Sequence, residues 1–172
     1  MWKYKVVKIY DGDTFLGERN LHFETVRLNW IDAPEIQRSH QELRNITDER
    51  QWYWGDRSRK EFENFVENSA DPGHIWINEY ERDKYGRVLG DVFRDYRYFN
   101  KDNLQCHLLR SGLAVNFFPR MDRIVWEKSY PRVRLFCAFL RANYWARKKG
   151  RGVWSDPNFM IPYEYRQSWF SP

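Results

Sequence analysis

The sequence predicts an α+β fold in which a few helices pack against a small closed β-barrel. Five short runs rich in β-branched and aromatic residues are typical of strands, and loops separate them. Only two or three segments carry apolar residues at the three- and four-residue spacing of a helix. This pattern favours one small barrel, and 172 residues suffice for one compact domain but not for two ordinary ones.

The first two predicted strands, residues 3–10 and 13–20, flank an Asp-Gly turn. Asp11 and Gly12 suit a hairpin, because glycine accepts positive φ without steric cost. The turn does not explain Asp13, which stands where the outgoing strand begins. A carboxylate there needs either water or a positive partner, so Asp13 is the first candidate for a functional residue.

The third predicted strand, residues 21–32, alternates apolar and polar side chains and ends before Pro34, which cannot donate to a strand ladder. Residues 36–51 are polar without a clear period and predict a mobile surface loop. A helical pattern emerges at about Tyr53 and ends in the ADPG sequence at residues 70–73. The first helix is therefore expected to follow the third strand after a polar connection.

Two further strands are predicted at residues 74–80 and 88–93, on either side of a turn centred on Gly86. Gly90 within the second of them predicts a bulge or a close approach between strands. The segment 100–112 predicts a short helix closed by its final glycine.

Residues 113–122 predict a strand or a loop, and Pro131 suits the first turn of the last helix. The basic end of that helix, residues 146–152, complements the negative end of a helix dipole. The apolar stripe of this helix is predicted to consist of Val133, Phe136, Cys137, Leu140 and Tyr144.

Composition narrows the class of protein. Hydrophobic residues make up 42% of the chain and aromatic residues 19%, which excludes a disordered chain. The formal net charge of +5 should attract polyanions, although such an excess also occurs in proteins that touch no nucleic acid. Cys106 and Cys137 are too few for a disulfide framework and predict buried free thiols. The scattered histidines match no zinc site.

Nothing in the sequence indicates a membrane or a leader. No basic, apolar leader opens the chain, and no apolar run approaches membrane-spanning length. We therefore expect a cytoplasmic protein without membrane contact, and secretion remains open if a leader has been removed.

Five charged residues lie at or near the ends of predicted strands: Asp13, Arg27, Asp32, Glu35 and Arg87. Carboxylates and a carbonyl suffice as ligands for Ca²⁺. Arginine forks match phosphate oxygens, and a third carboxylate can take a proton from an attacking water. A turn, a cap or an ordinary ion pair is the better explanation for any one of these residues, but the complete set is what a phosphodiester-cleaving site with one hard cation needs.

Three stretches, VVKIYDGDTF, VRLNWIDAPE and ERDKYGRVLG, resemble the signature motifs of the staphylococcal nuclease (thermonuclease) family in order and separation. The later stretches LLRSGLA and GRGVWSDPNFMIPYEYR resemble further landmarks of that family, so the resemblance covers about residues 4–166. It implies an SNase-like fold, a five-stranded OB-type barrel with about three helices. The implied activity is Ca²⁺-dependent cleavage of DNA and RNA with little sugar or sequence discrimination, leaving 3′-phosphate ends.

The resemblance also implies roles by motif position. It assigns the ligands of one Ca²⁺ ion, which are Asp13, Asp32 and the backbone carbonyl of Ala33. It assigns the groups that act on the phosphate, which are Arg27, Arg87, Tyr85 and, as general base or water-mediated neighbour of the metal, Glu35.

Three departures from the family pattern leave alternatives open. Ala33 stands where some relatives have threonine, which is harmless if only its carbonyl binds metal. Phe117 and Phe118 stand where relatives often have a tyrosine or tryptophan pair, and they either stack on a base or pack in the core. The WYW sequence at residues 52–54 closes a long segment that begins at residue 37. It is either core packing at a helix start or a lid that contacts substrate or a partner.

We expect a single domain over residues 1–172, with a polar loop at about 36–52 and a C-terminal tail at about 155–172. The leading hypothesis is a monomeric, metal-dependent nuclease acting on DNA, RNA or both. The alternative is a non-catalytic OB-type module that binds nucleic acid or protein. Regulation of a real nuclease by a partner protein through the WYW segment is a third possibility.

Overall fold

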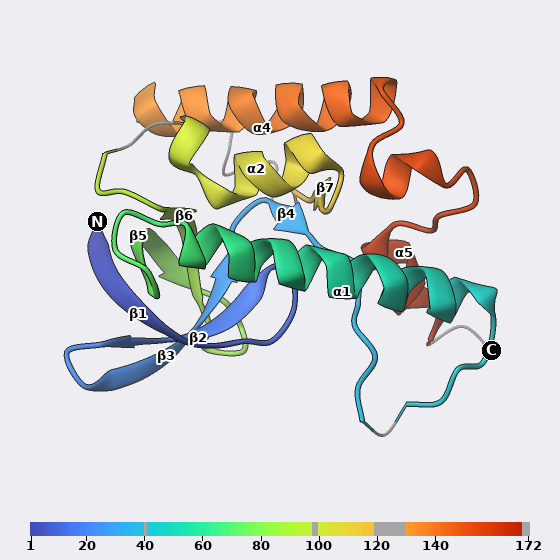
Figure 1. Ribbon diagram of the computed structural model, residues 1–172, viewed down its shortest axis with the longest axis horizontal. Helices are drawn as coiled ribbons and strands as arrows, with labels where there is room; N and C mark the ends of the chain where they lie inside the picture. Colours follow the sequence, from blue (N-terminus) through green and yellow to red (C-terminus); the bar gives the residue numbers. More distant parts are fainter. Residues whose placement is uncertain (40, 98–99, 119–129, 170–172) are drawn as a thin grey trace.

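The protein is a closed five-stranded barrel with helices packed around it (Figure 1). The computed structural model describes residues 1–39, 41–97, 100–118 and 130–169. The barrel strands run in the order β1-β2-β3-β6-β5, and β3 and β6 are its parallel pair. The strands are β1 (Trp2–Ile9), β2 (Thr14–Arg19), β3 (His22–Leu28), β5 (His74–Arg82) and β6 (Val88–Phe93). The predicted α+β barrel is confirmed.

Alternation along the strands fills the barrel. Each strand sends every second side chain inward, which is the period of a strand with one buried face. The fully buried barrel residues include Tyr4, Phe15, Val26, Ile75, Ile77 and Val92. A Cβ on Gly90 would lie 2.7 Å from Ile77 Cγ2, so β5 and β6 pack more closely here than a side chain would permit. The close approach predicted at Gly90 is confirmed, and a bulge in β5 lies opposite it.

The third predicted strand is divided in two. Trp30 has φ of +63°, so the chain leaves β3 and resumes as the two-residue strand β4 (Ile31–Asp32). Strand β4 pairs with β7 (Val115–Asn116), outside the barrel. The break directs Asp32 away from the barrel sheet, which continuous alternation in the sequence does not reveal.

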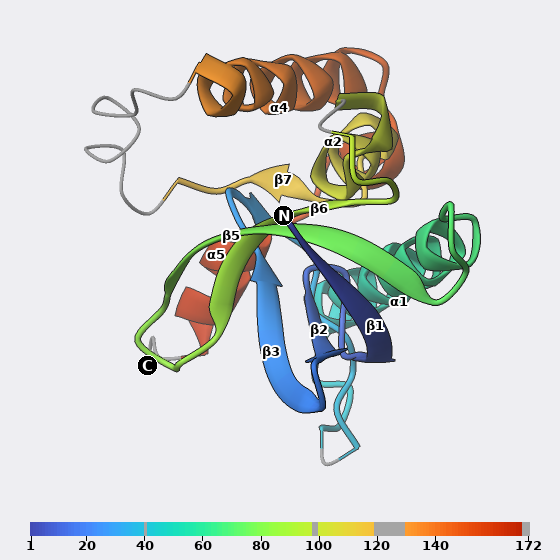
Figure 2. The same cartoon turned by 90° about the vertical axis from the view of Figure 1, so that its left-hand side faces the viewer.

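Four α-helices occur within the described residues, one more than the three expected. They are α1 (Ile46–Glu67), α2 (Leu104–Ser111), α4 (Tyr130–Lys148) and α5 (Pro162–Ser168). The 3-10 helices are η1 (Asn100–Asp102) and η2 (Gly152–Ser155). Helix α1 runs along the barrel, and α4 lies on α2 as an outer layer (Figures 1 and 2). Gly112 ends α2 at φ of +69°, as predicted.

Helix α1 begins at Ile46, well before Tyr53, so the end of the predicted polar loop is helical. The side chain of Asn45 caps the helix by accepting hydrogen bonds from the Thr47 and Asp48 N–H groups. The spacing of apolar residues did not reveal the start of this helix, because the first half of its buried face carries polar or small residues. Its buried residues are Asp48, Gln51, Gly55, Ser58, Phe62, Phe65 and Val66.

The apolar stripe predicted for the last helix is wrong. Val133, Cys137, Leu140 and Tyr144 are exposed, and Phe136 is half-buried. The face of α4 that packs into the core carries Leu135, Phe139, Ala142 and Ala146. Apolar residues occur on both faces of this helix, so their period does not identify the side covered by α2.

Of the two free cysteines, Cys106 is buried as predicted and Cys137 is exposed, so the prediction fails for Cys137. None of the described helices has the combination of length and apolar character that spanning a bilayer requires. The C-terminal segment predicted as a tail, at about 155–172, contains α5 within its described residues, and η2 ends where this segment begins.

Candidate active site

The turn between β1 and β2 presents Asp13 beside helix α1. The Asp13 N–H donates to the Asp11 side chain at 2.9 Å, which closes the turn. A Cβ on Gly12 would lie 2.6 Å from Ser58 Cβ and 2.8 Å from Ala33 Cβ, so only glycine lets the turn approach α1 and the strand end so closely. Packing against α1, as well as turn chemistry, therefore places Asp13.

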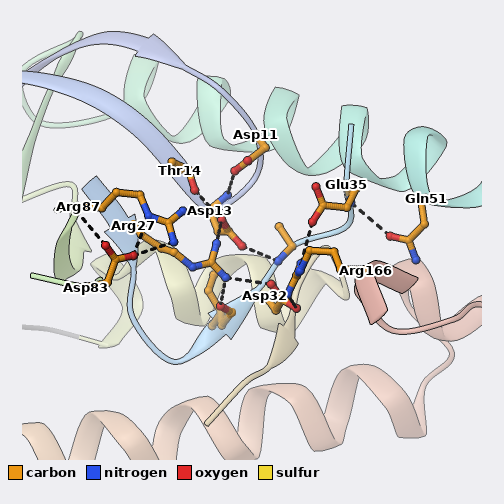
Figure 3. A network of polar contacts seen from close by, with 12 residues as sticks. Asp11, Asp13, Thr14, Arg27, Asp32, Glu35, Gln51, Asp83, Arg87 and Arg166 are labelled. Carbon is orange, nitrogen blue, oxygen red and sulfur yellow. Dashed lines mark hydrogen bonds and ion pairs between the residues drawn. The ribbon is translucent and has the colours of Figure 1, made fainter. Parts of the chain in front are cut away.

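Arg27 joins two buried aspartates (Figure 3). Its guanidinium donates to Asp13 Oδ1, and to Asp32 Oδ1 at 2.9 Å. Asp13 Oδ2 also accepts the Ala33 N–H at 2.8 Å. Asp13 is 2% exposed and Asp32 is 0% exposed. Three of the predicted site residues thus meet at the end of β3, and the Asp13 carboxylate has the positive partner that its position requires.

Arg166 is a member of this cluster that sequence reasoning missed. Its two terminal nitrogens donate to Asp32 Oδ2 at 2.8 Å and to Glu35 Oε1 at 2.7 Å. It comes from α5, and the preceding Tyr165 hydroxyl donates to buried Asp48 on α1 at 2.6 Å. The Arg44 guanidinium holds the pKa of Asp48 down at about 2, so the acceptor of this bond stays ionised. The only sequence signal for Arg166 was its place in the PYEYR landmark.

Helix α1 holds the backbone of Glu35 in position. The Glu35 N–H donates to the Gln51 side chain at 3.2 Å. A Cβ on Gly55 would lie 2.2 Å from the Glu35 carbonyl oxygen, so the segment crosses α1 in direct backbone contact. Gln51 also donates to the Met160 carbonyl, which ties the approach to α5 to the same point. One stretch of α1 therefore fixes both Glu35 and the segment that delivers Arg166.

Arg87 lies apart from the carboxylate cluster and pairs with Asp83, from Nε at 2.8 Å and from Nη2 at 2.7 Å. Asp83 also accepts the Tyr85 and Arg87 backbone N–H groups. Figure 3 shows this pair beside Arg27. Both arginines line one cavity of about 800 Å³, so they face the same space although they bond different carboxylates.

The predicted substrate contacts are distributed unequally around this cavity. Tyr85 lines it and is 72% exposed. Phe117 also lines it, with its ring 5.4 Å from that of Tyr163 on α5. Phe118 does not line it and packs on Phe136 of α4 at 5.0 Å. The two phenylalanines therefore have different environments, and only Phe117 faces the cavity.

The cluster is short of positive charge. Four carboxylates, from Asp11, Asp13, Asp32 and Glu35, face two guanidinium groups from Arg27 and Arg166. Burial is the largest influence on Asp11, Asp32 and Glu35, and it raises the pKa of each carboxyl above its ordinary value. A divalent cation would supply the missing charge, and the ligands are all oxygen, which suits a hard ion.

The cluster suits a divalent cation in its charge and in its oxygen ligands, but it does not form a preformed coordination site. In the described parts of the chain, no group of three or more His, Cys, Asp or Glu side chains is arranged to hold a metal ion. Guanidinium groups occupy the space between the carboxylates instead. The three described histidines lie away from the site: His22 is exposed, His74 lies 3.4 Å from Asp71, and His107 pairs with Glu61 at 2.5 Å. His40 lies outside the described residues.

Comparison with known proteins gives a consistent picture. The family described as "Staphylococcal nuclease homologue" matches residues 25–156. Protein ParB of Escherichia coli is 26% identical over 167 residues, covering 95% of this chain and 78% of that protein. A micrococcal nuclease of Shigella flexneri is 26% identical over 168 residues, with coverages of 95% and 80%. An uncharacterized endonuclease of Haemophilus influenzae is 27% identical over 165 residues, with coverages of 95% and 72%.

Proposed function

The chain belongs to the staphylococcal nuclease family, and on that premise we propose that it is a Ca²⁺-dependent endonuclease acting on DNA, RNA or both. The proposal includes low sugar and sequence specificity and 3′-phosphate products. Similarity to proteins named nuclease and endonuclease supports hydrolysis of nucleic acid in general. The observation that carries the site assignment is the meeting of Asp13, Arg27, Asp32 and Glu35 beside a cavity that also receives Arg87.

The barrier to be lowered is electrostatic, because an anionic phosphodiester must be attacked by an oxygen nucleophile. Asp13, Asp32 and the Ala33 carbonyl would hold the cation. When bound, the cation would polarise a phosphate oxygen and lower the pKa of a bound water. Arg27 and Arg87 would bind the phosphate oxygens and stabilise the charge that develops there. To bind phosphate, Arg27 and Arg87 must each release a carboxylate to which they donate in this structure. Both line the same cavity, which leaves room for a phosphate between them.

Glu35 is assigned as the base. Its carboxylate would take a proton from water as the water oxygen bonds to phosphorus. The bond from phosphorus to the 5′ oxygen would break, and that oxygen would take a proton from a second water to leave as a hydroxyl. Burial raises the pKa of Glu35, which brings the base closer to a neutral operating pH. Tyr85 and Phe117 line the same cavity and would contact the phosphate and a base.

Digestion of plasmid DNA and of RNA tests the proposed function. We expect cleavage with added Ca²⁺ and none with excess chelator, with activity restored when Ca²⁺ is returned. Products should carry 3′-phosphates, which end-specific phosphatase treatment detects. Folded protein that cleaves neither substrate with any divalent cation would reject the proposal, and cleavage that persists in chelator would reject its metal dependence.

Arg166 is assigned as a positioning residue, because it holds Asp32 and Glu35 at a fixed separation. Replacing Arg166 by glutamine should lower kcat by about a hundredfold, the cost of a misplacement of about 1 Å, while KM changes much less. Arg166→Lys should recover part of the loss, since it keeps the charge without the two-pronged geometry.

Arg134→Gln is the matched control, because Arg134 is exposed on α4 and does not line the cavity that holds Arg27 and Arg87. Steady-state kinetics on one oligonucleotide would measure the effect. An Arg166→Gln protein with kcat equal to that of the control would remove the assignment. A change in KM alone would make Arg166 a binding residue instead.

A further inference from the structure

A second cavity of about 520 Å³ borders the candidate site. It is formed by the end of β1, the segment after Glu35 and one face of α1. None of its lining residues lines the larger cavity that holds Arg27 and Arg87. The site therefore has two separate hollows beside it, and the assigned roles use only one.

The lining of this cavity is continuous with the site along the chain. Tyr10 precedes Asp11, Ile36 follows Glu35, and Trp52 follows Gln51, which accepts the Glu35 N–H. Consecutive Cα atoms lie about 3.8 Å apart. The backbone that lines the cavity is therefore continuous with the backbone of Asp11 and Glu35.

The chemistry of the lining suits a nucleotide. Tyr10 is 36% exposed, and the Lys8 ammonium lies 5.5 Å from the centre of its ring. Trp52 adds a second aromatic surface. Its indole N–H is shielded from water and has no hydrogen-bond partner among the described residues. Aromatic faces for stacking beside cations for the backbone are how single strands are held.

The charged residues that line the cavity are Lys8, Arg59 and Asp56, so the lining carries a small positive excess. Arg59 is paired with Asp56 at 2.9 Å and with Glu63 at 2.7 Å. Lys8 is exposed, and the described residues give it no carboxylate partner. Lys8 can therefore contact a phosphate without breaking an ion pair, whereas Arg59 cannot.

We propose that this second cavity binds the nucleotide on the opposite side of the scissile phosphate from the one in the larger cavity. The inference rests on the proposed function. An internal phosphodiester has a nucleoside on each side, so an endonuclease must accommodate both. Tyr10 and Trp52 would stack on a base, and Lys8 would contact the adjoining phosphate. This role also answers the question raised by the WYW sequence, with Trp52 as its substrate-contacting residue.

Binding in chelator tests the inference without any cleavage. The probe is a fluorescein-labelled oligothymidylate followed by anisotropy, and competition by thymidine 5′-phosphate reports on a single nucleotide. Trp52→Leu should weaken oligothymidylate binding by about ten- to a hundredfold, the cost of one stacked base. Lys8→Gln should weaken it less and reduce the slope of log K against log salt by about 0.7.

Matched controls are Trp54→Leu, two residues along the same helix, and Lys5→Gln, an exposed lysine of the same strand. Both should bind oligothymidylate like the parent protein. Thymidine 5′-phosphate should bind all four variants with equal affinity when it competes with the labelled probe. Lys8 is exposed, so its variant reports even if Trp52→Leu fails to fold. The proposal would be overturned if the Lys8→Gln protein and the folded Trp52→Leu protein bound oligothymidylate as tightly as the controls.

The test separates the inference from the function on which it rests. A protein that cleaves nucleic acid but whose variants bind like the controls would lose the second subsite and keep the nuclease function. A protein that never cleaves but whose Lys8 and Trp52 variants lose affinity would keep the subsite as a binding surface and lose the enzyme. Cleavage tests the nuclease function and anisotropy tests the subsite, so the failure of one can be distinguished from the failure of the other.

Discussion

Replacing Glu35 by glutamine should reduce the rate of nucleic-acid cleavage by about a hundred- to ten-thousandfold, the range expected when a general base is lost. Glutamine keeps the size and a hydrogen-bond acceptor for Arg166, but it cannot take a proton at neutral pH. Substrate binding should change little, because the proton moves only in the reaction. Single-turnover cleavage of an oligonucleotide and its affinity in chelator would be measured on the same preparation.

A companion variant distinguishes a base from a general disturbance of the site. Arg87→Ala should lower both affinity and rate, because Arg87 is assigned to the phosphate and lines the larger cavity. If both proteins fold and cleave as fast as the parent, the assigned site is wrong. A chain that binds nucleic acid, with or without these changes, and never cleaves it is the non-catalytic OB-type module instead.

Replacing Arg27 by glutamine should harm stability and activity together. The guanidinium lies between two carboxylates that are almost completely buried, Asp13 and Asp32. Removing one partner of a buried pair leaves uncompensated charge, which typically costs about 3–5 kcal/mol. Loss of a preorganised donor to the phosphate should also reduce the rate by about a hundred- to a thousandfold. Urea unfolding and single-turnover cleavage would measure the two effects.

The pH dependence of the Arg27→Gln protein gives an internal check. Burial already raises the pKa of Asp32, and Arg27 opposes that rise, so without Arg27 the folded-state pKa of Asp32 should rise further. A raised carboxyl pKa removes stability as pH increases, and the deficit should therefore be larger at pH 8 than at pH 5. Added Ca²⁺ should recover part of it, since an ion that binds only the folded state stabilises that state.

Arg141→Gln removes one positive charge from an exposed position of α4 and serves as the control. It should unfold at the parent's urea concentration and cleave at the parent's rate. An Arg27→Gln protein as stable as this control at pH 8 would mean that Asp13 and Asp32 do not depend on Arg27 for their charge balance. The electrostatic description of the cluster would then be wrong.

The barrel could be predicted because its determinants are local. Runs of β-branched and aromatic residues bounded by turn residues gave β1, β2, β5 and β6 nearly to the residue. Glycines at turns and at close strand contacts have steric causes that act within a few residues, as at Gly90. The start of α1 was missed because its buried face carries Asp48, Gln51 and Ser58. Tyr165 and Met160, which are far away in the sequence, bond to Asp48 and Gln51, and Ser58 packs against Gly12.

By itself, the sequence determined the barrel, its turns and the five charged residues of the family motifs, because neighbours along the chain encode periods, turns and motifs. Only the tertiary structure decided that Arg166 binds Asp32 across 134 positions, that α4 buries Leu135 and Phe139 rather than Val133 and Leu140, and that Trp52 lines a second hollow. The physical reason is that ion pairs, helix faces and cavities depend on which surfaces meet after folding. No local pattern records that choice.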